Sequence, residues 1–156
     1  MDILVCCDSH GDVFNFSNIM QRKFKFDVCS VGGATAQGAV NPGSKTNALE
    51  VFTDFINKPR IKSCKIMILL GEVDCGFIIW VRSKKYNISV DEQIELSVSN
   101  LFSFIDNILV THPYYKNNDI IVAGTVLPTI KDSTDPSILA GARSEVDVCQ
   151  FERTQK

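Results

Sequence analysis

The sequence is poor in histidine, paired-cysteine motifs, positive charge and long apolar runs, and each shortage excludes a class of protein. It has two histidines, and none of its six cysteines forms a C-x-x-C pair, so we expect no metal site and no cofactor. The 18 acidic residues outnumber the 16 basic ones and give a net charge of −2. This balance supplies no basic field, so nucleic acid is not an expected partner.

Neither a secretory leader nor a membrane span is recognisable. Met1 is followed at once by an apolar run without a basic segment or cleavage site, and no apolar stretch approaches the ~18 residues of a span. Four cysteines lie in or beside apolar runs, where reduced cysteine behaves as a small hydrophobe: Cys6, Cys7, Cys29 and Cys64. We therefore predict a cytoplasmic protein with reduced cysteines and no membrane partner.

With 45% hydrophobic and 22% charged residues, the chain fits one globular domain over residues 1–156. Four short apolar runs lack period-2 alternation, as strands buried on both faces do: Ile3–Cys7, Phe26–Val31, Cys64–Leu70 and Asp119–Thr125. Helical patterns lie between them, at Val13–Phe24, Ala48–Asn57 and Val90–Leu109. This alternation predicts an α/β fold of three layers, α/β/α, with a parallel, flavodoxin-like sheet in the order 2-1-3-4.

Local signals support the helix starts and mark two long connections. Ser89–Glu92 has the capping-box pattern, and Asn47–Glu50 resembles one with asparagine as the cap. Gly32–Thr46 and Gly71–Ser89 are too long for plain turns, and both follow strands. We therefore expect both connections at the carboxyl edge of the sheet, where ligands of open α/β folds bind. One further helix is expected at Leu139–Glu152 with no fifth strand after it, so the domain is expected to be incomplete at its C-terminus.

The first expected strand runs directly into a helix through Asp8, Ser9, His10 and Gly11. Such a turn can hold the Ser9 hydroxyl at the positive end of the helix dipole, where developing negative charge is favoured. The alternative is that Asp8 or Ser9 only caps the helix.

The next two strands end in residues that suit the same site. Gly32 and Gly33 permit positive φ and free amide donors, or simply a tight turn. Glu72 and Asp74 follow the third strand, and i and i+2 on an extended segment point the same way. They could form a carboxylate pair or a metal site, but we find no third ligand and expect them to hydrogen-bond near Ser9.

The succession DSH, GGAT, GEVD and VLP after the four strands resembles the block order of the SGNH (GDSL-type) hydrolases over nearly the whole chain. The resemblance implies Ser9 as nucleophile, with the amides of Ser9 and Gly33 in the oxyanion hole. Asp8, His10, Glu72 and Asp74 would then line the pocket. The block-three asparagine falls on Val73, and the Asp-x-x-His block has no counterpart before the last residue.

Neither histidine is placed as a clear general base for Ser9. His10 is its neighbour and could line the pocket or bond Asp74, whereas His112 precedes the fourth strand and belongs at the opposite edge.

Three functions remain in competition. The first is an esterase that transfers the acyl group of a small-molecule or glycan ester to Ser9, inactive as this chain alone. The strings GATAQGAVNPGSKTNA and GEVDCGFIIWVRSKKYNI resemble SGNH-like proteins of bacterial surface-polysaccharide loci, which implies O-acylated sugars. The second is a non-catalytic glycan-binding or interaction domain. The third is a phosphate-handling domain that uses Asp8.

Overall fold

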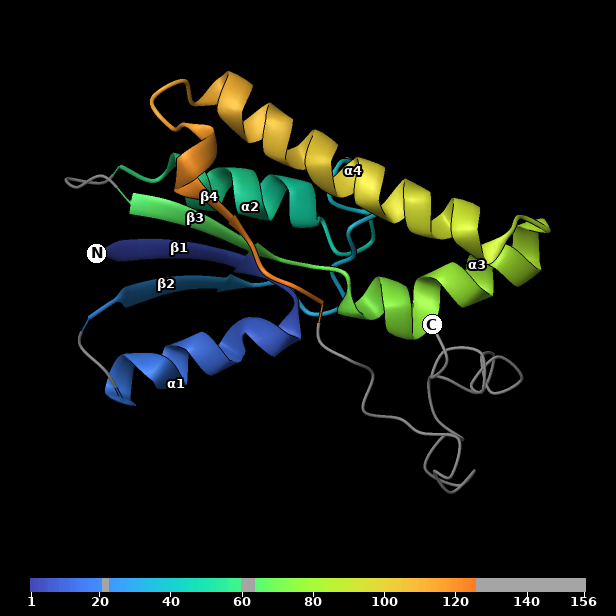
Figure 1. Ribbon diagram of the computed structural model, residues 1–156, viewed down its shortest axis with the longest axis horizontal. Coiled ribbons are helices and arrows are strands. Elements are labelled where there is room, and N and C mark those ends of the chain that lie inside the picture. The colour runs from blue at the N-terminus through green and yellow to red at the C-terminus, as the bar shows by residue number, and fades with distance from the viewer. Residues whose placement is uncertain (21–22, 60–63, 126–156) are drawn as a thin grey trace.

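The computed structural model describes residues 1–20, 23–59 and 64–125 (Figure 1). Its centre is a four-stranded, all-parallel sheet in the order β2-β1-β3-β4, which confirms the predicted order. The strands are β1 (Asp2–Cys7), β2 (Lys25–Ser30), β3 (Cys64–Leu69) and β4 (Ile120–Val122). Cys7 pairs in register with Ser30 on one side and with Leu69 on the other, so these three strands end together.

The helices follow the predicted order but differ in extent. They are η1 (Ser9–Asp12), α1 (Val13–Met20), α2 (Ala48–Asn57), η2 (Asp74–Ile78), α3 (Ile79–Tyr86), α4 (Val90–Thr111) and η3 (Asn117–Asp119). Helix α2 has the predicted bounds, and α4 is two residues longer than predicted. The expected helix Leu139–Glu152 and the expected lack of a fifth strand lie outside the described residues.

Helices pack on both faces of the sheet, as Figure 1 shows with α1 on one side and α2 and α4 on the other. Leu4 and Cys6 of β1 join the core formed with α2 and α4, whereas Ile3, Val5 and Cys7 pack on the α1 side. Both faces of β1 are therefore buried, which explains its missing alternation. β2 was expected to be buried too, but it is an edge strand with exposed and half-buried side chains.

The two predicted helix caps have different outcomes. Ser89 and Glu92 form both halves of a capping box at the start of α4, as predicted. Asn47 adopts a left-handed conformation with φ 51° and makes no cap hydrogen bond. Its side-chain amide instead donates to Glu50 Oε2 at 2.5 Å, so Asn47 occupies the predicted cap position of α2 but the capping box does not form.

The expected long connection Gly71–Ser89 is helical over most of its length, whereas 32–46 contains neither helix nor strand. Ile79 and Trp80 are buried, and the Trp80 indole donates to the Cys75 carbonyl at 2.6 Å. Asn87, in the left-handed region, ends α3. The burial of these apolar side chains on one side therefore stabilises a helix where a long connection was expected.

Among the described residues, α4 is long and apolar enough to cross a membrane by length and composition, contrary to the expectation that no stretch approaches a span. The core helix of a soluble protein passes the same test, but such a helix is mostly buried, whereas 22% of this stretch is buried; Phe104, Ile105 and Ile108 of α4 lie in the core. The cytoplasmic location and the absence of a membrane partner therefore stay predictions.

Candidate functional site

The predicted site residues lie where the strands end, at the carboxyl edge of the sheet. Ser9 follows β1, Gly33 follows β2, and Glu72 and Asp74 follow β3. The ladder continues one step past the strands, because the Asp8 amide donates to the Leu69 carbonyl at 3.3 Å. This placement at the edge was predicted. Which of these side chains contact one another was not.

The turn after β1 is tight and is held by Asp8. Asp8 is only 1% exposed, and its Oδ1 accepts from the His10 amide at 2.9 Å as the cap of η1. A Cβ atom on Gly11 would lie 2.0 Å from Cys7 Sγ, so the turn can pack this closely only with glycine there. The capping role considered for Asp8 is therefore confirmed.

Ser9 presents its polar groups at this turn. Its side chain is exposed, and its hydroxyl makes no hydrogen bond within the part of the chain that the structure describes. In the same residues, the amides of Ser9 and Gly33 donate to no acceptor. Gly33 has φ +74°, the positive value that the paired glycines were expected to permit. The segments after β1 and β2 therefore each leave one backbone donor free, and free donors of this kind bind negatively charged oxygens.

Beside Ser9, the side chains of Asp8, His10 and Glu72 form what we call the rim cluster. His10 Nδ1 lies 3.0 Å from Asp8 Oδ1 and 3.6 Å from Glu72 Oε2. One ligand atom from each residue can be chosen so that all lie within 4.8 Å of one another. Asp8 Oδ2 is buried and has no hydrogen-bond partner among the described residues. His10 therefore contacts Asp8 and Glu72, and the suggested bond to Asp74 is wrong.

Glu72 and Asp74 diverge because the chain changes conformation at the end of β3. Gly71 has φ +118°, and the helical conformation begins at Glu72, so the segment is not extended as expected. In a helix, successive residues are rotated by about 100°, so residues two apart point to nearly opposite sides, about 160° apart. The predicted pairing of these two carboxylates near Ser9 is therefore wrong, and each takes part in a different structure.

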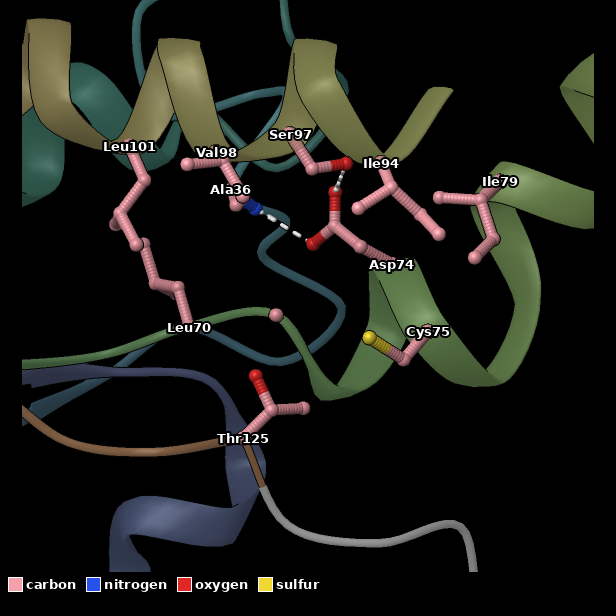
Figure 2. A pocket seen from close by; sticks show the side chains of 11 residues that line it. Ala36, Leu70, Asp74, Cys75, Ile79, Ile94, Ser97, Val98, Leu101 and Thr125 are labelled. Carbon is pink, nitrogen blue, oxygen red and sulfur yellow. Dashed lines mark hydrogen bonds between the residues drawn. The ribbon is translucent and has the colours of Figure 1, made fainter. Parts of the chain in front are cut away.

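Asp74 anchors the long connection after β2. Its Oδ2 accepts from the Ala36 amide at 2.6 Å, and its Oδ1 accepts from the Gln37 amide at 3.1 Å and the Ser97 hydroxyl at 3.2 Å. Figure 2 shows the Asp74 carboxylate between Ala36 and Ser97 of α4. Burial raises the pKa of Asp74, and these hydrogen bonds act in the opposite direction. Asp74 therefore positions a loop rather than facing Ser9.

Gln37 extends this buried polar network to two helices. Its side-chain amide donates to Ser97 Oγ at 3.0 Å and to the Gln93 carbonyl at 3.1 Å, and its oxygen accepts from Arg82 of α3. No periodic pattern in the sequence indicates this network, because its members come from separate elements.

A cavity of about 90 Å³ lies beside Asp74, between the end of β3, η2 and α4 (Figure 2). Mostly apolar residues line it: Ala36, Leu70, Gly71, Asp74, Cys75, Ile79, Ile94, Ser97, Val98, Leu101 and Thr125. The Asp74 oxygens at its wall are already hydrogen-bonded, so the cavity offers mainly apolar contact. Sequence reasoning missed it, since helical spacing cannot separate residues that line a cavity from those that fill a core.

His112 lies at the other edge, as predicted. It ends α4, which leads towards the start of β4, and its Nε2 lies 2.7 Å from Asn57 Oδ1. No described histidine is hydrogen-bonded to Ser9.

Comparisons with protein-family models, with curated proteins and with solved structures gave no match.

Proposed function

We propose that this chain is an SGNH-like ester hydrolase of three-layer, flavodoxin-like architecture, with Ser9 as nucleophile and an O-acylated compound, such as an acylated sugar, as substrate. The supporting observation is that the exposed Ser9 hydroxyl and the amides of Ser9 and Gly33, in the segments that follow two adjacent strands, make no hydrogen bond among the described residues. Exposed amides at the ends of adjacent strands are what an oxyanion hole requires.

The reaction would proceed by acyl transfer. Ser9 Oγ attacks the ester carbonyl carbon while a general base takes its proton, and the carbonyl oxygen becomes an oxyanion that accepts from the Ser9 and Gly33 amides. Collapse of this intermediate expels the alcohol, which takes up the proton, and water then hydrolyses the acyl-serine. Val73 supplies no third donor, and a missing donor costs on the order of 3 kcal/mol, about a hundredfold in rate.

The general base is the missing part, because no described histidine is bonded to Ser9. Without a base the Ser9 hydroxyl stays protonated at neutral pH, so the chain alone is expected to hydrolyse esters very slowly. A base supplied from solution should then restore part of the rate.

The test is p-nitrophenyl acetate hydrolysis by the chain and by Ser9→Ala, each over a series of imidazole concentrations. Subtracting the Ser9→Ala rate removes direct hydrolysis by imidazole. We expect a difference that grows with imidazole and an acetyl group on Ser9 by mass spectrometry. Equal rates for the two proteins at every concentration would refute Ser9 as nucleophile.

A non-catalytic domain that binds a glycan or a partner is the second candidate. It is favoured by Val73, which provides no oxyanion donor, and by Asp74, whose oxygens are occupied within the fold. Equal rates in the imidazole experiment, together with binding of acylated oligosaccharides by both proteins, would support it.

A further inference from the structure

We propose that the rim cluster of Asp8, His10 and Glu72 binds one divalent transition-metal ion of the Zn²⁺ or Mn²⁺ type. The cluster lies at the carboxyl edge of the sheet, next to Ser9. The proposal does not depend on Ser9 being a nucleophile.

The two separations that involve His10 are close to those of ligands that share one ion. Two ligands that each lie about 2.1 Å from a metal are about 3.0 Å apart at octahedral angles and about 3.4 Å apart at tetrahedral angles. His10 Nδ1 lies 3.0 Å from Asp8 Oδ1 and 3.6 Å from Glu72 Oε2. All three ligand atoms lie within 4.8 Å of one another, so one ion could contact the three side chains after a modest adjustment.

A second, independent observation is the unpartnered oxygen of Asp8. The residue is 1% exposed, yet its Oδ2 has no donor among the described residues. A buried carboxylate oxygen without a partner is costly, and it commonly marks the place of a water or an ion. This oxygen belongs to the same carboxylate as Oδ1, the atom that contacts His10 Nδ1.

Charge favours an ion over a water molecule. The carboxylates of Asp8 and Glu72 are nearly buried, and in the described part of the chain their ion-pair contacts involve only His10. Two buried carboxylates need positive charge nearby, which a divalent cation supplies and a neutral water does not.

The backbone holds two of the three ligands in place. The ladder bond to Leu69 and the cap of η1 fix Asp8, and the positive φ of Gly71 directs the chain into the helical turn of Glu72. The His10 side chain is 40% exposed, so an ion there would keep open positions for water or substrate. Three protein ligands with an open position are typical of catalytic metal sites.

The ligand types select the metal. One imidazole with two carboxylates suits Zn²⁺ or Mn²⁺ better than Ca²⁺, which prefers all-oxygen sites. The buried Cys7 thiol donates to the Cys29 carbonyl at 3.5 Å and is not one of the three residues of the cluster.

The test is titration of the reduced, chelator-treated full chain with Co²⁺ as a visible probe, followed by competition with Zn²⁺ and Mn²⁺. We expect one equivalent of Co²⁺, with d–d absorption, no thiolate charge-transfer band and displacement by Zn²⁺. His10→Ala and Glu72→Gln should each weaken binding at least about tenfold. Asp12→Asn, an exposed carboxylate two residues from His10, is the matched control and should bind like wild type.

Three results would overturn the proposal: no Co²⁺ binding at millimolar concentration, unchanged affinity in His10→Ala, or a charge-transfer band that shows cysteine ligation. Circular dichroism of the metal-free variants checks folding. If Glu72→Gln does not fold, His10→Ala decides, since its side chain is partly exposed. The titration reads metal binding alone, so failure of the Ser9 esterase experiment leaves its outcome unaffected.

Discussion

At the scale of single residues, the cysteine thiols give a direct prediction of reactivity. Burial, followed by the charges of Asp8 and Asp12, raises the pKa of Cys7 from 9.0 to about 12. Each pKa unit lowers the thiolate fraction about tenfold near pH 8, and the thiolate is the species that reacts. We expect iodoacetamide to modify Cys7 about a thousandfold more slowly in the folded chain than in urea, measured by mass spectrometry of peptides.

Cys29 and Cys75 should also react more slowly than in the unfolded chain, because burial raises their pKa values too. Modification of Cys7 at the same rate in the folded and unfolded chains would contradict its burial. No disulfide forms among the cysteines that the structure describes, which agrees with the predicted reduced state for those residues.

The residues that follow each expected strand could be predicted to lie at the carboxyl edge. Which of their side chains contact one another could not be predicted. Ser9, Gly33 and Glu72 follow strands as expected. The pairing of Glu72 with Asp74 was wrong because it assumed an extended backbone, and the turn at Gly71 could not be seen from composition. The direction of a side chain depends on the backbone φ and ψ angles. Assuming an extended backbone where the chain is helical therefore places the second carboxylate on the wrong side.

At the scale of elements, the capping box of α4 gives a prediction for stability. Ser89→Ala removes the hydroxyl that accepts from the Glu92 amide, and loss of such a cap costs about 1 kcal/mol in the free energy of unfolding. Urea denaturation of the two proteins measures it. Ser99→Ala, at an exposed position inside the same helix, is the control and should change stability little. Equal losses in both variants would show that the cap is not responsible.

The contribution of the Ser89–Glu92 capping box to stability should decrease at acid pH. The hydrogen bonds from the Ser89 hydroxyl and backbone lower the pKa of Glu92. A lowered carboxyl pKa stabilises the folded state above the unfolded pKa, and this stabilisation is lost as pH falls through the folded value. The difference between wild type and Ser89→Ala should therefore shrink below about pH 4.

Elements with strong periodicity could be predicted, and elements set by tertiary contacts could not. Helix α2 has the predicted bounds because its apolar residues recur at helical spacing, with Phe52, Phe55 and Ile56 buried. The helices within Gly71–Ser89 were missed, although Asn87 at the end of α3 is a common helix terminator. Their stability comes from the packing of Ile79 and Trp80, which only the folded chain shows.

At the scale of the whole molecule, the sheet order could be predicted because right-handed crossovers leave few arrangements for alternating strands and helices. The network around Asp74 could not, because it joins the connection after β2 to η2 and α4 across long sequence separations. Asp74 is 38 residues from Ala36 and 23 from Ser97. No local pattern encodes such contacts.

Replacing Asp74 therefore tests whether this network holds the molecule together. Asp74→Ala would leave the Ala36 and Gln37 amides and the Ser97 hydroxyl without this acceptor, and the unpaired buried donors cost on the order of 3 kcal/mol. We expect this loss in urea denaturation near pH 7, and almost none for the control Asp106→Ala, an exposed residue of α4. A loss below about 1 kcal/mol would contradict the anchoring role.

The pH dependence provides a second measure of the same residue. Burial raises the pKa of Asp74 above its unfolded value of 3.8, more than the hydrogen bonds lower it. A raised carboxyl pKa contributes stability that is fully present below the unfolded value and is lost as pH rises through the folded value. The advantage of wild type over Asp74→Ala should therefore be larger near pH 4 than near pH 7. An advantage that instead grows with pH would mean that the amides of Ala36 and Gln37 stabilise the carboxylate more than burial destabilises it.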